Sequence, residues 1–101
     1  MNEPYYAVIF TSNRTEGDKG YADMAIKMEN LARQQPGFLG VESAKEDIGI
    51  TVSYWKNLKS IAKWREHTEH MLAQTKGKSQ WYQKYSIRIC KVEREYHFYK
   101  E

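Results

Sequence analysis

The pattern of hydrophobic and polar positions changes its period along the first third of the chain. Tyr5–Thr11 is a short run of β-branched and aromatic residues that ends in a polar cluster, Ser12–Lys19, which is typical of a buried strand followed by a loop. From Gly20 to Gln35, apolar residues recur at spacings of three and four with charged residues between them, which predicts an amphipathic helix. Asp18 is a candidate N-cap, and Pro36-Gly37 ends the helix.

A pair of strands follows this helix. Phe38–Glu46 alternates loosely, Asp47 forms a tight turn, and Ile48–Trp55 places its apolar side chains on one face. The short connection predicts that the two strands form an antiparallel hairpin. Asn57 then caps a second helix, which starts at Leu58.

The second helical pattern runs, less regularly, through Gln74 and is broken by Gly77. Trp81–Arg94 is the last predicted strand, and in it Val92 falls out of phase with the apolar positions before it. A β-bulge near Cys90-Lys91 would explain that slip. The tail Tyr96–Tyr99 is too aromatic to stay free and is expected to pack on something.

The order of elements is therefore β-α-β-β-α-β, which predicts a single α+β domain over residues 1–101 with a ferredoxin-like antiparallel sheet. Two helices can cover only one face of a four-stranded sheet. In the first strand, however, Tyr5, Ala7 and Ile9 alternate with residues that are also apolar. The second apolar face needs a cover, and the simplest cover is another copy of the chain in a two-fold homodimer.

Composition narrows the possible functions. The 101 residues carry 16 Lys and Arg against 13 Asp and Glu, a formal charge of +3 whose scattered basic residues do not indicate nucleic-acid binding. The one cysteine, Cys90, allows neither an intrachain disulfide nor a cysteine metal cluster. We find neither a signal peptide nor an apolar run long enough to span a membrane, so the expected location is the cytoplasm.

Three stretches in order resemble the antibiotic biosynthesis monooxygenase superfamily. They are the Gln35–Glu42 turn (QPGFLGVE) into the second strand, the strand Ile50–Trp55 followed by Asn57-Leu58, and the helix stretch Trp64–His70 with its "W..H..H" spacing. The resemblance covers nearly the whole chain. It implies a dimer in which two sheets form a shared β-barrel, and members that include quinone-forming oxygenases and haem-degrading enzymes.

The quinone-forming branch of this superfamily works without metal or flavin, because the aromatic substrate itself supplies electrons to oxygen. Its proteins contribute an apolar cleft, hydrogen-bond donors and a group that removes a phenolic proton. Suitable polar groups in this chain are His67, His70 and Asn13. Suitable substrate-binding side chains are Trp64, Trp55, Phe38, Trp81 and Tyr82. In a small domain, tryptophans of this kind are also common core residues, and a histidine between helix and sheet can be purely structural.

Helical geometry and the resemblance favour different histidines. On a regular helix His67 lies about 60° from Trp64, whereas His70 lies about 240° away and would need a break near Arg65-Glu66 to reach the same pocket. The resemblance favours His70, so we expect His70 to be the buried one. A metal site is not expected, since no third ligand accompanies the pair.

The haem-degrading branch is a weaker match. Its iron-ligating histidine would fall on Gln74, and a glutamine amide is a poor iron ligand. The sequence therefore favours a cofactor-independent monooxygenase that acts on a small hydrophobic aromatic or quinonoid metabolite. The alternatives are a non-catalytic dimeric module that binds a small ligand or responds to stress and, less favoured, a haem-degrading monooxygenase.

Overall fold

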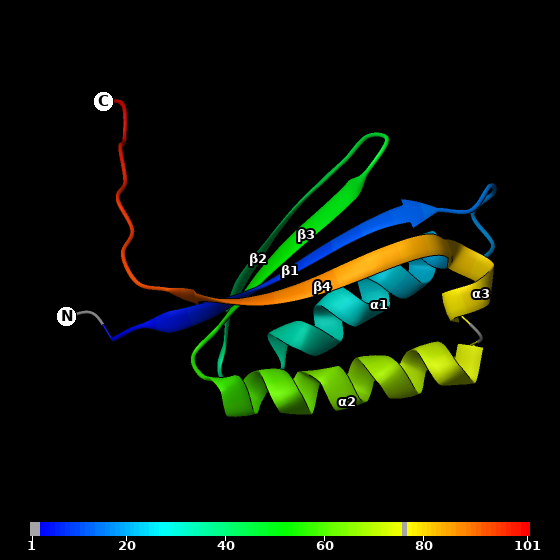
Figure 1. The fold of residues 1–101 in the computed structure, drawn as a ribbon, viewed down its shortest axis with the longest axis horizontal. Coiled ribbons are helices and arrows are strands. Elements are labelled where there is room, and N and C mark those ends of the chain that lie inside the picture. The colour runs from blue at the N-terminus through cyan, green and yellow to red at the C-terminus, as the bar shows by residue number, and fades with distance from the viewer. Residues whose placement is uncertain (1–2, 76) are drawn as a thin grey trace.

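The computed structural model describes residues 3–75 and 77–101, with the side chains of residues 73–78 outside the described part. The chain folds as a four-stranded sheet with its helices gathered on one side (Figure 1). The elements are β1 (Tyr5–Arg14), α1 (Tyr21–Arg33), β2 (Phe38–Lys45), β3 (Gly49–Trp55), α2 (Leu58–Thr75), α3 (Gly77–Trp81) and β4 (Tyr82–Val92). The predicted α+β ferredoxin-like order is confirmed, with the short helix α3 added before the last strand.

The sheet has the strand order β2-β3-β1-β4, and every neighbouring pair is antiparallel. The central strand β1 pairs with β3 on one side and with β4 on the other, so β2 and β4 are the edge strands. Figure 1 shows α1 and α2 below the sheet, with α2 under the β4 edge. This arrangement leaves the opposite face of the sheet bare in a single chain.

Several predicted boundaries shift. β1 continues to Arg14 through part of the predicted loop, and Trp81 ends α3 instead of starting β4. The predicted bulge at Cys90-Lys91 is wrong, because both residues pair with β1 in unbroken register; the irregularity lies at Asn13/Arg14. The position of Val92 is explained without a bulge. It pairs with Tyr5, and both side chains lie on the bare face of the sheet, which also carries apolar residues.

Side-chain oxygens cap the first turns of α1 and α2. Gly20, not Asp18, is the N-cap of α1, and it adopts a left-handed backbone with φ of 84°. The Asp18 carboxylate nevertheless accepts hydrogen bonds from the backbone N–H groups of Gly20 and Ala22, at 2.9 and 3.1 Å. Asn57 caps α2 as predicted, since its Oδ1 accepts the Ser60 N–H at 2.8 Å.

The core lies between α1, α2 and the sheet, and its centre is Trp55, which is completely buried. The Trp55 ring stacks on Trp64 from α2 at a centroid distance of 5.8 Å, and Phe38 meets it edge-on at 5.4 Å. Gly37 makes this packing possible: its φ is 86°, and a Cβ there would collide with the Ser60 side chain. The turn between α1 and β2 therefore requires glycine.

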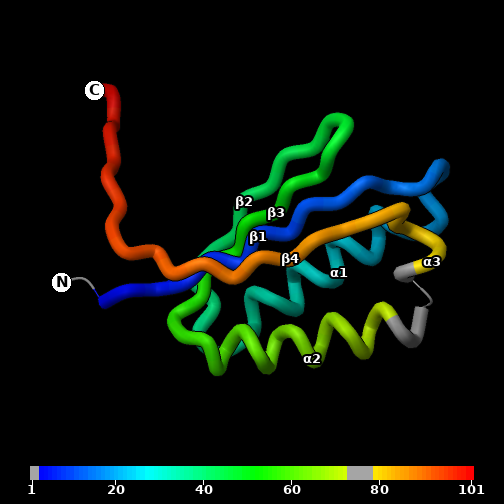
Figure 2. Tube along the Cα trace, in the orientation of Figure 1, coloured from blue at the N-terminus to red at the C-terminus, as the bar shows by residue number. Residues whose placement is uncertain are grey.

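The bare face of the sheet is apolar. Val8 packs against the core, so its neighbour Ile9 points to the opposite side, where the pairing places Val52 beside it. The aromatic tail adds to this uncovered surface, because Tyr96, Phe98 and Tyr99 are 80–86% exposed. The prediction that the tail packs is thus wrong within one chain, as Figure 2 shows. Among the described helices, none combines the length and hydropathy needed to cross a membrane.

Candidate functional site

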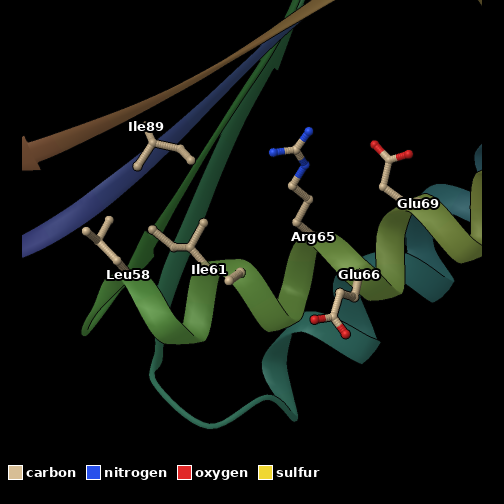
Figure 3. Close-up of a pocket in the computed structure, with 7 residues that line it drawn as sticks. Leu58, Ile61, Arg65, Glu66, Glu69 and Ile89 are labelled. Carbon is tan, nitrogen blue, oxygen red and sulfur yellow. The ribbon is translucent and has the colours of Figure 1, made fainter.

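A cleft of about 520 Å³ lies between α2 and the β4 edge of the sheet. Its lining residues are Leu58, Ile61, Ala62, Arg65, Glu66 and Glu69 from α2, and Ile89 from β4 (Figure 3). The cleft exists because α2 contacts the core through Ile61 and Trp64, which pack with Trp55 of β3, and not through the side chains that face β4. Ile87 and Ile89 on the helix-facing side of β4 therefore stay 45% and 47% exposed.

Helix geometry explains why these α2 residues gather on one side. At about 100° per residue, Leu58, Ala62, Arg65 and Glu69 fall within an arc of about 60°, adjacent to the core-facing Ile61. Figure 3 shows the side chains of Leu58, Arg65 and Glu69 on the side of α2 that faces the sheet, whereas Glu66 points away from it. The cleft is thus apolar at the Leu58 end and carries a guanidinium and a carboxylate further along α2.

This arrangement can bind and polarise an aromatic ligand. The Arg65 guanidinium is a permanent cation with planar donors, which suits a phenolate or carboxylate oxygen. The Glu69 carboxylate stands one turn further along the same helix and can accept a proton. None of the described residues that line the cleft is a histidine, and Arg65 keeps its charge. Proton transfer in the cleft therefore falls to Glu69, because the Glu66 side chain points away from the sheet (Figure 3).

The histidines lie elsewhere on α2. His70 is exposed, and at nine residues from the core-facing Ile61 it lies about 180° around the helix, on the side away from the sheet. The expectation that His70 is buried is therefore wrong, because α2 continues through Arg65-Glu66 without the required break. His67, also exposed, is the histidine beside Trp64, with 6.2 Å between ring centroids.

The other predicted site residues fall into separate groups. Trp55, Phe38 and Trp64 form the ring stack of the core, outside the lining of the cleft. Trp81 is buried, and its indole N–H donates to the Lys19 carbonyl at 2.9 Å. Asn13 donates from Nδ2 to the Asp47 carbonyl at 3.3 Å, next to the β2–β3 turn. The structure therefore does not bring the predicted residues into one pocket.

Tyr82 belongs to an aromatic cluster at the far end of β4. Its ring packs edge-on against Tyr21, Phe10 and Tyr85, with centroid distances of 5.4–5.8 Å. Burial raises the pKa of Tyr82 far above its ordinary value, and a hydrogen bond with Tyr21 raises the pKa further. The Arg14 guanidinium, which stacks on the Tyr21 ring at 3.5 Å, opposes this shift only in part.

The raised pKa of Tyr82 predicts an alkaline loss of stability. Above pH 10 the unfolded chain releases the Tyr82 proton while the folded chain keeps it, so unfolding becomes easier as the pH rises. The contribution is complete below pH 10 and falls by up to about 1.4 kcal/mol per pH unit above it. Urea unfolding between pH 9 and 11 should show a shallower pH dependence for Tyr82→Phe. Tyr96→Phe, in the exposed tail, is the matched control and should keep the wild-type slope.

Gln74, the position expected to align with a haem ligand, lies outside the described side chains. In the part of the chain that the structure describes, no three His, Cys, Asp or Glu side chains gather as they would around a metal ion.

Comparison with known proteins gives one sequence relative and several structural neighbours. No family model matches the sequence. The uncharacterized protein YqjZ from Bacillus subtilis is 54% identical over 94 residues, covering 91% of this chain and 82% of YqjZ. SnoaB from Streptomyces nogalater, a cofactor-independent oxygenase, superimposes with a TM-score of 0.73 at 7% identity, over 90% of this chain and 95% of SnoaB. A candidate antibiotic biosynthesis monooxygenase from Nitrosomonas europaea superimposes with a TM-score of 0.70 at 10% identity, over 92% of this chain and 93% of the other.

Proposed function

We propose that the chain, which belongs to the family of YqjZ and has the α+β ferredoxin-like fold of SnoaB, is a cofactor-independent oxygenase for a small hydrophobic aromatic or quinonoid compound. The observation that carries this proposal is the cleft between α2 and β4. We further propose that the working unit is a homodimer in which a second copy covers the apolar face of the sheet.

The size and lining of the cleft support an aromatic substrate. Ligand-binding clefts usually measure about 300–1,000 Å³, and they combine apolar walls with a few polar groups. The cleft of about 520 Å³ has apolar surface from Leu58, Ala62 and Ile89. A planar compound of two or three fused rings fits these walls, with a phenolic oxygen directed toward Arg65.

The proposed chemistry needs little from the protein. Glu69 accepts the phenolic proton, and the Arg65 guanidinium stabilises the resulting phenolate, which is a stronger electron donor than the phenol. The phenolate ring then supplies electrons to molecular oxygen. One oxygen atom becomes the new quinone carbonyl at a ring CH₂ position, and the other leaves as water with the two hydrogens of that carbon.

The test is turnover of a hydroxyanthrone, followed by oxygen uptake and quinone absorbance. Ala62→Trp places a large ring in the cleft and should lower kcat/KM at least about 100-fold, or about 2.7 kcal/mol. Lys63→Trp adds the same ring one position along α2, about 100° away from the cleft, and should stay within about twofold of wild type. His70→Ala, on the far side of the helix, should also retain turnover. Full activity of Ala62→Trp would show that the reaction does not take place in the α2–β4 cleft.

A non-catalytic ligand-binding dimer is the second candidate. It is favoured by the position of His67 and His70, since both exposed imidazoles lie outside the lining of the cleft and cannot contact a ligand bound there. Calorimetry with the same hydroxyanthrone distinguishes the two functions. Binding that Ala62→Trp abolishes, without oxygen uptake by the wild-type protein, would establish the binding module and overturn the oxygenase.

A further inference from the structure

The α2–β4 cleft is longer than a fused-ring compound alone. Its lining on α2 runs from Leu58 to Glu69, which is roughly 16 Å at a rise of about 1.5 Å per residue. Fused rings whose phenolic oxygen lies between Arg65 and Glu69 reach back along the helix to the level of Ala62. The stretch of the cleft from Ala62 to Leu58, about 6 Å long, then stays uncovered.

The uncovered end of the cleft is lined by aliphatic side chains that lie partly in water. Leu58 is 53% exposed and Ile89 is 47% exposed, while the neighbouring Ile61 is buried. Figure 3 shows Ile89 above Leu58 and Ile61, with Arg65 and Glu69 further along α2. Facing aliphatic side chains of this kind mark a surface that an apolar part of a ligand covers, because leaving them in water forfeits their burial energy.

The opposite end of the cleft determines which polar group the ligand carries. The Arg65 guanidinium only donates hydrogen bonds and the ionised Glu69 carboxylate only accepts them, so a hydroxyl group, which does both, suits the space between them. A ligand carboxylate there would face the negative charge of Glu69, and Glu66 in the same lining adds to that repulsion. The cleft therefore favours a ligand that is uncharged and polar at one end and aliphatic at the other.

We propose that the substrate is an alkylated phenol, whose fused rings carry an unbranched chain of about five carbons that lies between Leu58 and Ile89. An extended chain advances about 1.25 Å per carbon, so five carbons fill the 6 Å or so from Ala62 to Leu58. Lys91 follows Ile89 on the helix-facing side of β4, since it pairs with the core-packed Tyr6. A longer chain therefore passes the aliphatic side chains and meets an ammonium group and water. This inference rests on the proposed function for the reaction, whereas the contact with the chain is a property of the cleft itself.

A series of hydroxyanthrones that differ only in the length of one alkyl chain, from none to heptyl, tests this contact. The value of kcat/KM from oxygen uptake should rise about twofold per carbon and level off after about five, since a fully buried methylene contributes about fourfold and one side of this chain stays in water. The pentyl compound should thus exceed the unsubstituted one about 30-fold. Leu58→Asn should reduce this ratio below about tenfold. Leu39→Asn makes the same change at a leucine of β2 that is 55% exposed and outside the lining of the cleft, and it should keep the wild-type ratio.

Calorimetric dissociation constants for the same series separate this inference from the oxygenase reaction. Turnover of the unsubstituted compound, with kcat/KM and Kd both independent of chain length, overturns the chain contact and leaves the oxygenase standing. A Kd that falls with chain length, without oxygen uptake from any compound, supports the chain contact and overturns the oxygenase. A ratio that Leu58→Asn and Leu39→Asn keep alike shows that the chain gains affinity without contacting Leu58, and it also overturns the inference.

Discussion

Trp55→Ala should lower the free energy of unfolding by about 3–5 kcal/mol, because truncating a buried tryptophan leaves a cavity that its neighbours fill only in part. Trp55 is completely buried between Phe38 and Trp64, and its indole N–H donates to Ser53 Oγ at 2.8 Å. The substitution removes two ring contacts and leaves the Ser53 hydroxyl without this donor. A domain of this size is stable by only about 5–15 kcal/mol, so the loss is a large share of the total.

Urea unfolding at one fixed protein concentration measures this effect, since a dimer gains apparent stability with concentration. Ile26→Ala also truncates a large apolar side chain, but Ile26 is 63% exposed, so that variant should stay within about 0.5 kcal/mol of wild type. If Trp55→Ala does not fold, Trp55→Phe keeps a ring in place and should lose a smaller part of the stability. A loss below about 1 kcal/mol for Trp55→Ala would show that the three-ring stack does not organise the core.

The order of elements could be predicted because each has its own hydrophobic period. The helix from Tyr21 and the hairpin around Asp47 follow directly from spacing and turn chemistry. The end of β1 could not be predicted in this way. Turn-forming residues follow Thr11, yet β1 continues, since Arg14 pairs with Tyr82 of β4 and donates to the Trp81 carbonyl. Both partners are distant in the sequence and approach Arg14 only in the folded chain.

Val92 shows a second limit of sequence pattern. Its departure from the preceding apolar phase predicts a bulge, whereas the register through Cys90 and Lys91 is regular. A period-two pattern identifies one buried face, and it becomes ambiguous when both faces of a strand carry apolar side chains. Apolar residues at successive positions of the first strand show the same ambiguity, and they are the sequence evidence that the sheet has a second apolar face.

The candidate site was only partly predictable. The sequence pattern places the site on α2, but the spacing from Trp64 favours His67 and His70 instead of the residues that line the cleft. A helical wheel centred on the core-facing Ile61 would have placed Ala62, Arg65 and Glu69 toward β4 and His70 toward solvent. The position of Ile89 in the cleft could not be foreseen, because it depends on how far α2 lies from the edge strand.

Val52→Lys should convert the proposed homodimer into a monomer of 12.0 kDa. Val52 lies on the inner strand β3 and pairs with Ile9, so its side chain occupies the middle of the apolar face away from the helices. A second copy on that face would bury the new ammonium group twice, once for each chain of a two-fold dimer. Removing such an ion from water without a partner costs several kcal/mol per charge, which exceeds what most single interface contacts contribute.

Light scattering at micromolar concentration measures the mass, and circular dichroism checks that the monomer keeps its fold, since a lysine on this face of an isolated chain stays in water. Ile26→Lys adds the same charge on the exposed surface of α1 and should remain a dimer. A dimeric Val52→Lys protein would mean that the copies associate through another surface, such as the α2–β4 edge. In that arrangement the partner would cover the opening of the α2–β4 cleft instead of the opposite face of the sheet. Substrate could then reach Arg65 only past the interface.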